Sequence, residues 1–196
     1  MAAGPALPGL FMCFAACVLL IFVSVSSPTW EKISFLNVPS DNGEIHFGVF
    51  GYTGSATHIG YNFNPSISGF DSSRINTNII HNLTYVLILY PIAAGISGLA
   101  FLFGLCGASY HRVGTIFMSL LAGLAMLVTL VAWVIDMVLF GIVKSRLHDQ
   151  NIDAKWGNAN WIGLGAFAAL LFGFCAAACG IFGSYRRRRS EAAATY

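Results

Sequence analysis

One acidic residue, Asp136, stands inside a long hydrophobic stretch, and it is the residue whose type most suggests chemistry. A charge in the middle of a membrane helix costs about 2.5 to 3.5 kcal/mol on insertion scales, so its presence needs a reason. A proton relay in a transporter is one reason, although a relay needs several ionisable groups in series and this stretch offers one. The stretch is longer than a bilayer requires, so we expect Trp133 and Asp136 to lie near the membrane interface. There Asp136 would accept hydrogen bonds from the segment outside the membrane or pair with Lys144 or Arg146.

Cysteines offer a second kind of chemistry. Cys13 with Cys17, and Cys175 with Cys179, are four positions apart, which places each pair on one face of a helix. A metal or heme site would need histidine or acidic partners beside them, and the sequence places none there. We therefore expect small packing residues and neither metal nor cofactor. Cys106 and Cys179 lie toward the ends of their stretches and are candidates for palmitoylation.

The histidines allow a pH-sensing hypothesis. His46, His58 and His81 fall in one polar segment and His148 in another, and imidazole titrates near pH 6.5. Exposed loop histidines without a special role are the simpler interpretation, because no carboxylates cluster around them. The chain also lacks paired carboxylates, a Ser/His/Asp or Cys/His grouping and a phosphate-binding glycine loop. The sequence therefore predicts that the protein is not an enzyme.

Composition predicts the elements that hold these residues. Hydrophobic residues make up 57% of the chain and charged residues 9%, with a mean hydropathy of +0.72, which is typical of an integral membrane protein. A helix needs about 20 residues to cross a bilayer. Four stretches qualify within one domain, 1–196: residues 7–26, 83–109, 113–143 and 161–184. The net charge of +2 comes without a basic face interleaved with aromatic residues, so we expect no nucleic-acid binding.

The short connection between the second and third stretches determines on which side of the membrane the longer loops lie. It forms a tight hairpin, so the loops 27–82 and 144–160 lie together on the opposite side. Four arginines, Arg186, Arg187, Arg188 and Arg189, open a tail at 185–196 and predict that both termini are cytoplasmic. They also suit anionic lipid headgroups. A cleaved signal peptide is the alternative for the first stretch, and Asn82 begins a glycosylation sequon that we expect to be unused.

The first outer loop carries alternating hydrophobic residues. Three runs, 33–38, 45–52 and 59–63, predict strands, and the turn residues at 39–43 connect the first two. The fold class we expect is an all-α membrane bundle of four transmembrane helices, with a small antiparallel sheet in the first extracellular loop. Pro91 predicts a bend in the outer half of the second helix. Small residues at four-residue spacing, such as Ala100, Gly104 and Ala108, favour close packing within the bundle or with other copies.

Several short motifs resemble the fungal PalI/Sur family, within the wider claudin-like tetraspan group. Besides the four stretches and the long first loop, they are Trp30, the run from Phe47 to Tyr52 with Gly48 and Gly51, Gly60 and Tyr61, the run from Trp133 to Phe140 around Asp136, and Gly157 to Trp161. The resemblance covers nearly the whole chain. It departs at one point: many members have two cysteines just after the Gly-x-Phe-Gly-Tyr run, and this loop has none, so the loop disulfide of the family is absent.

The resemblance implies a plasma-membrane protein that organises membrane microdomains, as Sur-type members do at eisosomes. Its partners would be membrane lipids, other membrane proteins or copies of itself. PalI-type ambient-pH signalling is the alternative, but PalI-type members usually carry a long cytoplasmic region, and this chain stops soon after Arg189. The organising role is therefore favoured, and a small transporter or channel that uses Asp136 is the second alternative.

Overall fold

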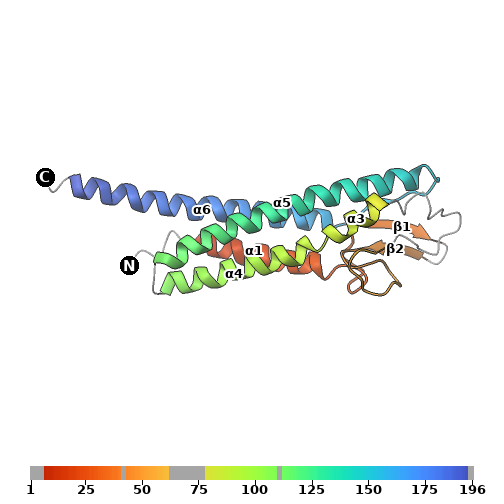
Figure 1. Ribbon diagram of the computed structural model, residues 1–196, viewed down its shortest axis with the longest axis horizontal. Helices are drawn as coiled ribbons and strands as arrows, with labels where there is room; N and C mark the ends of the chain where they lie inside the picture. Colours follow the sequence, from red (N-terminus) through yellow and green to blue (C-terminus); the bar gives the residue numbers. More distant parts are fainter. Residues whose placement is uncertain (1–6, 41–42, 62–77, 110–111, 194–196) are drawn as a thin grey trace.

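The computed structural model describes residues 7–40, 43–61, 78–109 and 112–193, which form an elongated helical bundle with a small sheet at one end (Figure 1). The helices are α1 (Leu7–Ser24), α3 (Asn78–Val86), α4 (Leu89–Ser109), α5 (Arg112–His148) and α6 (Ala159–Ala193). The strands are β1 (Leu36–Ser40), β2 (Gly43–Phe47) and β3 (Lys155–Trp156). We call the described segments 25–61 and 149–158, which include the sheet, the lobe. α1 begins and α6 ends at the end of the bundle remote from the lobe (Figure 1).

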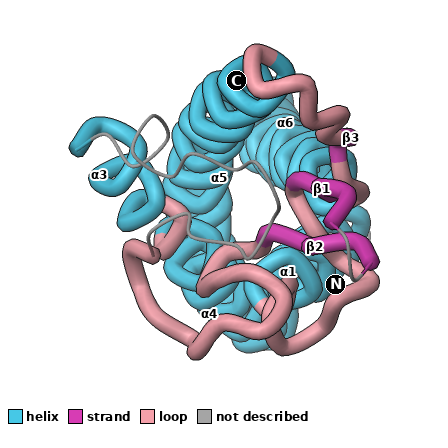
Figure 2. Tube along the Cα trace, turned by 90° about the vertical axis from the view of Figure 1, so that its right-hand side faces the viewer, coloured by secondary structure: helices cyan, strands magenta, loops and turns pink. Residues whose placement is uncertain are grey.

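The four long helices form a closed ring. α4 packs against α1 and α5, and α6 packs against the same two helices (Figure 2). Among the described residues, three helical windows are long and apolar enough to cross a membrane: His81–Gly107, Ile116–His148 and Ala159–Ala176, with mean hydropathies of 2.2, 2.5 and 1.7. The apolar helix at Pro8–Ser24 is shorter, yet the 18 residues of α1 span about 27 Å, close to the roughly 30 Å of a bilayer core. The predicted fold class, a four-helix membrane bundle with a small antiparallel sheet, is confirmed.

Two helices run beyond the stretches that hydropathy marks. α5 has 37 residues and is therefore about 55 Å long, so its C-terminal part extends past the bilayer thickness and stands beside the lobe (Figure 1). α6 continues to Ala193, past the predicted end of the fourth span at residue 184. The predicted tail at 185–196 is therefore helical as far as Ala193.

Pro91 lies in the first turn of α4, and the helix of the second span is interrupted just before it. A turn at residues 87–88 separates α3 from α4, so the second span consists of two helices that meet where a bend was predicted. Proline has no backbone N–H to donate to the Leu87 carbonyl. That carbonyl instead accepts a hydrogen bond from the Tyr90 N–H at 3.1 Å. Tyr90 therefore lies at the head of α4, directly after the interruption.

The sheet has the order β2-β1-β3, and both pairs are antiparallel. β1 pairs with β2 from Leu36 opposite Phe47 to Ser40 opposite Gly43, and the connection at residues 41–42 lies outside the described part. β3 comes from the second loop and pairs Trp156 with Leu36. The sheet therefore connects the loop after α1 with the loop between α5 and α6.

The predicted third strand at 59–63 is wrong in its described part, residues 59–61. Gly60 has a φ of +69°, a left-handed conformation that ends an extended strand. The side chain of Ile59 is exposed, while that of Tyr61 turns inward and is buried. Residues 62–63 lie outside the described part of the chain.

Candidate functional site

Asp136 is buried where the bundle meets the lobe. It lies on α5 with 0% of its side chain exposed, and its Oδ2 accepts a hydrogen bond from the Tyr90 hydroxyl at 3.2 Å. Its Oδ1 has no hydrogen-bond partner among the described residues. Lys144 and Arg146, the partners that we expected, are eight and ten residues further along α5, or roughly 12 and 15 Å along its axis. The partner is therefore Tyr90 at the head of α4, and the carboxyl group is shielded from lipid.

Trp133 and Asn160 extend this contact to α6. Trp133 lies one turn before Asp136, and its indole N–H donates to the Asn160 carbonyl at 3.3 Å. The side-chain amide of Asn160 donates to the carbonyl of Phe35 in the lobe at 3.1 Å. A Cβ on Gly163 would lie 3.3 Å from the Tyr90 hydroxyl oxygen, so α6 needs a small residue there to approach α4. Three helices and the lobe thus meet within one polar cluster.

Phe35 is the lobe residue that enters this cluster. Its ring is fully buried, stacks on Phe140 of α5 with centroids 5.3 Å apart, and contacts Tyr90 at 5.6 Å. Its backbone is held on both sides, because its N–H donates to Phe47 at 2.7 Å and its carbonyl accepts from Gly157 at 2.8 Å. We call the set Phe35, Tyr90, Trp133, Asp136, Phe140 and Asn160 the junction.

Glycine and tyrosine motif residues hold the first loop against the end of α1. A Cβ on Gly48 would lie 2.0 Å from the Ser27 carbonyl oxygen, so only glycine allows the two backbones to pass. The Tyr61 hydroxyl donates to the Gly48 carbonyl at 3.0 Å, and burial raises the pKa of that hydroxyl, with the negative charge of Asp136 as a smaller cause. Tyr52 packs its ring on Phe47 at 5.6 Å, and burial raises its pKa as well. These residues are structural supports of the lobe.

Two other motif glycines, unlike Gly48, have left-handed backbones. Gly51 has a φ of +152°, and a Cβ there would lie 2.4 Å from the Ser55 hydroxyl oxygen. Gly60 has a φ of +69°, and a Cβ there would lie 2.3 Å from the ring of Tyr85. Both positions therefore require glycine for the turn and for the space.

The remaining predicted residues do not join the junction. Trp30 is 43% exposed and lies against Phe22 of α1, with ring centroids 5.8 Å apart. Cys106 is a free, exposed thiol on α4. The side chains of Cys179 and of Arg186 to Arg189 lie outside the described part, although these residues belong to α6. In the described residues, no group of three or more His, Cys, Asp or Glu side chains is arranged to hold a metal ion.

Sequence reasoning missed Tyr90, Phe35 and Asn160. A signal for Tyr90 was available, because it adjoins Pro91 in an otherwise apolar stretch and has a hydroxyl that needs a partner in lipid. Asn160 lay inside the run from Gly157 to Trp161 that carries part of the resemblance. Phe35 gave no signal, because nothing local distinguishes it from neighbouring hydrophobic residues.

The region that contains the junction and the lobe matches a known family. The model of the SUR7/PalI family matches residues 5–179, which is most of the chain. The chain belongs to the SUR7/PalI family. The resemblance seen in the sequence is confirmed.

Two fungal relatives match parts of the SUR7/PalI region. The chain is 34% identical over 93 residues to the uncharacterized membrane protein TOS7 of Saccharomyces cerevisiae, which covers 45% of this chain and 16% of TOS7. It is 29% identical over 150 residues to the pH-response regulator protein palI/prr-5 of Neurospora crassa, which covers 69% of this chain and 21% of that protein. The chain therefore spans about a fifth or less of the length of these curated relatives. Their names describe a membrane protein and a regulator, not enzymes.

Proposed function

We propose that this SUR7/PalI family protein is a non-enzymatic organiser of plasma-membrane microdomains, of the eisosome type, or of the cell cortex. It acts through lateral packing of its helices and through contacts of its lobe with lipids, other membrane proteins or further copies. The observation that carries the proposal is that polar and apolar groups lie on different parts of the molecule. The polar groups of the junction are turned inward, where Tyr90 bonds to Asp136 and Trp133 bonds to Asn160, while the outer faces of the helices are apolar.

The apolar faces are broad. Exposed hydrophobic side chains include Leu99, Leu102 and Phe103 on α4 and Leu120, Leu124 and Leu127 on α5. In a bilayer such faces contact lipid or another helix, and close packing drives association there. The junction fixes the lobe to these helices, so neighbouring copies would present their lobes in a defined orientation. This arrangement supports an organising role better than a catalytic one.

The proposed location is the plasma membrane, with both termini cytoplasmic and the lobe outside. The positions of the chain ends support it, because α1 begins and α6 ends at the same end of the bundle (Figure 1). Arginines near the end of α6 favour the cytoplasmic side. An epitope tag at the C-terminus should bind antibody only in permeabilised cells, and binding in intact cells would reverse the orientation.

Lateral distribution in living cells tests the organising role. We expect the fluorescently tagged protein to gather in stable cortical patches in a fungal cell. A uniform plasma-membrane distribution or an endosomal one would contradict the proposal. Cells that express an unrelated four-span protein with the same tag provide the control for crowding and expression level.

An accessory role in ambient-pH sensing is the second candidate. It is favoured by the likeness to palI/prr-5, whose name describes a pH-response regulator. Replacement of His46, His58 and His81 by Gln tests it through growth at alkaline pH. A lost response would favour sensing, and an unchanged response would count against it.

Transport through Asp136 is the third candidate, because the carboxyl group is buried and its Oδ1 has no partner among the described residues. A relay requires further ionisable groups in series. Proton or solute flux in reconstituted vesicles that is lost in Asp136→Asn would favour transport over organisation. We expect no flux in either form.

A further inference from the structure

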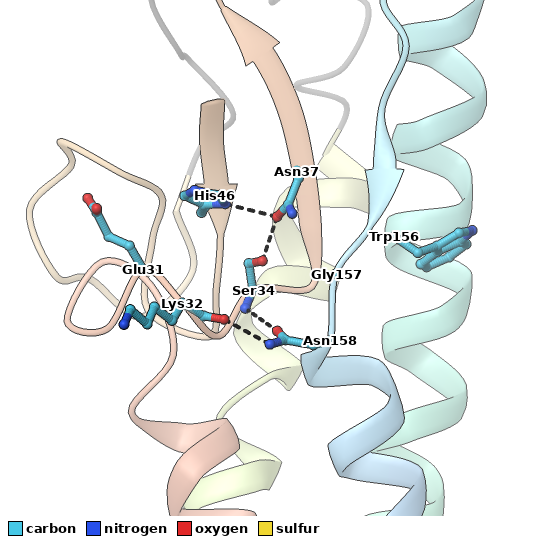
Figure 3. A pocket seen from close by; sticks show the side chains of 8 residues that line it. All are labelled: Glu31, Lys32, Ser34, Asn37, His46, Trp156, Gly157 and Asn158. Carbon is cyan, nitrogen blue, oxygen red and sulfur yellow. Dashed lines mark hydrogen bonds between the residues drawn. The ribbon is translucent and has the colours of Figure 1, made fainter. Parts of the chain in front are cut away.

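The lobe contains a polar pocket that the proposed function does not use. Its volume is about 550 Å³, within the range of about 300 to 1,000 Å³ typical of small-molecule sites. Figure 3 shows Ser34, Asn37 and His46 at its centre, with Glu31 and Lys32 on one side and Asn158 below. Asn37 and His46 are cross-strand neighbours on β1 and β2, so their side chains share one face of the sheet.

Hydrogen bonds between its lining residues shape the pocket. The Oδ1 of Asn37 accepts from the Ser34 hydroxyl and lies 3.0 Å from the Nδ1 of His46. The amide of Asn158 bridges to the first loop, because its nitrogen donates to the Lys32 carbonyl at 2.8 Å and its oxygen accepts from the Ser34 N–H at 3.1 Å. The Asn158 amide thus accepts one bond and donates one to the first loop, and the shared contact with Asn37 Oδ1 orients Ser34 and His46.

Other polar groups of the pocket remain available. Among the described residues, no ion pair or hydrogen bond is assigned to the Glu31 carboxylate, the Lys32 ammonium group or the Asn37 amide nitrogen. Glu31 and Lys32 have opposite charges, so the lining does not select an anion or a cation. The free groups include both donors and acceptors. A ligand that donates and accepts through several hydroxyl groups fits this lining.

The position of the pocket points to the source of that ligand. Glu31 and Lys32 lie in the turn closed by the bond from the Ile33 N–H to the Trp30 carbonyl. Asn158 begins a turn that is closed by the hydrogen bond from the Trp161 N–H to the Asn158 carbonyl. Trp30 is 43% and Trp161 is 68% exposed, beside the ends of two apolar helices, where tryptophan marks the membrane interface. The two exposed tryptophans next to these turns are the argument for a pocket beside the lipid headgroups.

We propose that this pocket binds the polyhydroxylated headgroup of a membrane lipid, a neutral sugar ring. A soluble sugar has the same chemistry, but the two flanking tryptophans favour the membrane as the source. The site goes beyond the organising role and does not depend on it, because its test measures lipid binding by the purified chain and not clustering in cells.

Native mass spectrometry of the full chain, released from a polyoxyethylene detergent, provides the test. Glucosylceramide is the probe, and ceramide, which lacks the sugar, is its matched control. We expect retention of glucosylceramide to exceed that of ceramide by about tenfold, because the ring adds several hydrogen bonds. Equal retention of the two lipids would overturn the proposal.

Two variants locate the bound lipid. Glu31→Gln alters an exposed rim residue that holds no structural bond in the described part, and Glu44→Gln alters an exposed residue of β2 outside the pocket. We expect about a tenfold loss of glucosylceramide in Glu31→Gln and no loss in Glu44→Gln. Equal binding by the two variants would overturn the site. Displacement of the lipid by free glucose at the same concentration would contradict the claim that the ligand comes from the membrane. Displacement by inorganic phosphate would contradict the claim that the headgroup is a neutral sugar.

Discussion

Tyr90 and Asp136 form the contact on which the residue-scale account depends. Sequence alone indicated that Asp136 needs a partner, because an isolated carboxyl group is costly in a membrane. It did not indicate which partner, because Tyr90 and Asp136 are 46 positions apart and approach only through the packing of α4 on α5. The glycines of the loop were visible as motif residues, but the backbones that they allow to pass were not.

Loss of the Tyr90 hydroxyl should destabilise the protein. Tyr90→Phe leaves the buried carboxyl group of Asp136 without its donor, which costs about 1 to 3 kcal/mol. Thermal unfolding in nanodiscs should show a lower midpoint. Tyr85→Phe, at an exposed tyrosine, is the control and should change stability by less than about 0.5 kcal/mol. Equal shifts in the two variants would contradict the junction.

A methyl group at Gly48 should displace the first loop. Gly48→Ala places a Cβ 2.0 Å from the Ser27 carbonyl oxygen, and overpacking of this kind costs about 1 to 3 kcal/mol. Gly95→Ala on α4 is the control, because a Cβ there has no neighbour within 4 Å. Unfolding midpoints should fall for Gly48→Ala alone, and an unchanged midpoint would show that the loop can shift without cost.

Tyr61 should make the stability of the folded protein fall at alkaline pH. Burial raises its pKa in the folded protein above the unfolded value of about 10. Its contribution to stability is therefore complete below pH 10 and is lost as the pH rises above that value. Tyr61→Phe should flatten the decline of the unfolding midpoint above pH 10, and an identical decline in wild type and variant would contradict this role.

At the scale of elements, hydropathy predicted the four helices and the alternating runs predicted the first two strands in outline. Local patterns could not predict the third strand, because β3 has two residues and pairs with β1 from a loop more than a hundred positions away. The run at 59–61 has an alternating pattern, but the left-handed backbone at Gly60 overrides it. The second span is divided into α3 and α4 at a turn just before Pro91, in the part of the span where the sequence predicted a bend.

The connection of lobe to bundle should fail when Phe35 is truncated. Phe35→Ala removes a fully buried ring between Tyr90 and Phe140, at a cost of about 3 to 5 kcal/mol. Limited proteolysis should then cut the lobe within residues 43–61 while the helices stay protected in the membrane. Ile59→Ala, at an exposed position, should leave the wild-type pattern. Equal cleavage of the two variants would mean that the lobe is held by other contacts.

At the scale of the whole molecule, a closed ring of helices carries apolar outer faces, inward polar groups and a lobe held by the junction. The sequence predicted the class of membrane protein and its family correctly, because composition and short motifs are local properties. It could not predict the junction, which is a property of how four separate segments meet. The proposed organising role would depend on both: the faces for lateral contact and the junction for a fixed lobe.

Fluorescence recovery after photobleaching of the tagged protein in fungal cells tests the organising role most directly. We expect wild type and Ile59→Ala to form cortical patches that recover slowly, because copies are held by lateral contacts and oriented lobes. Phe35→Ala should reach the membrane in similar amounts but recover quickly, because its lobe is no longer fixed. Uniform, rapidly recovering fluorescence from the wild-type protein would contradict the account.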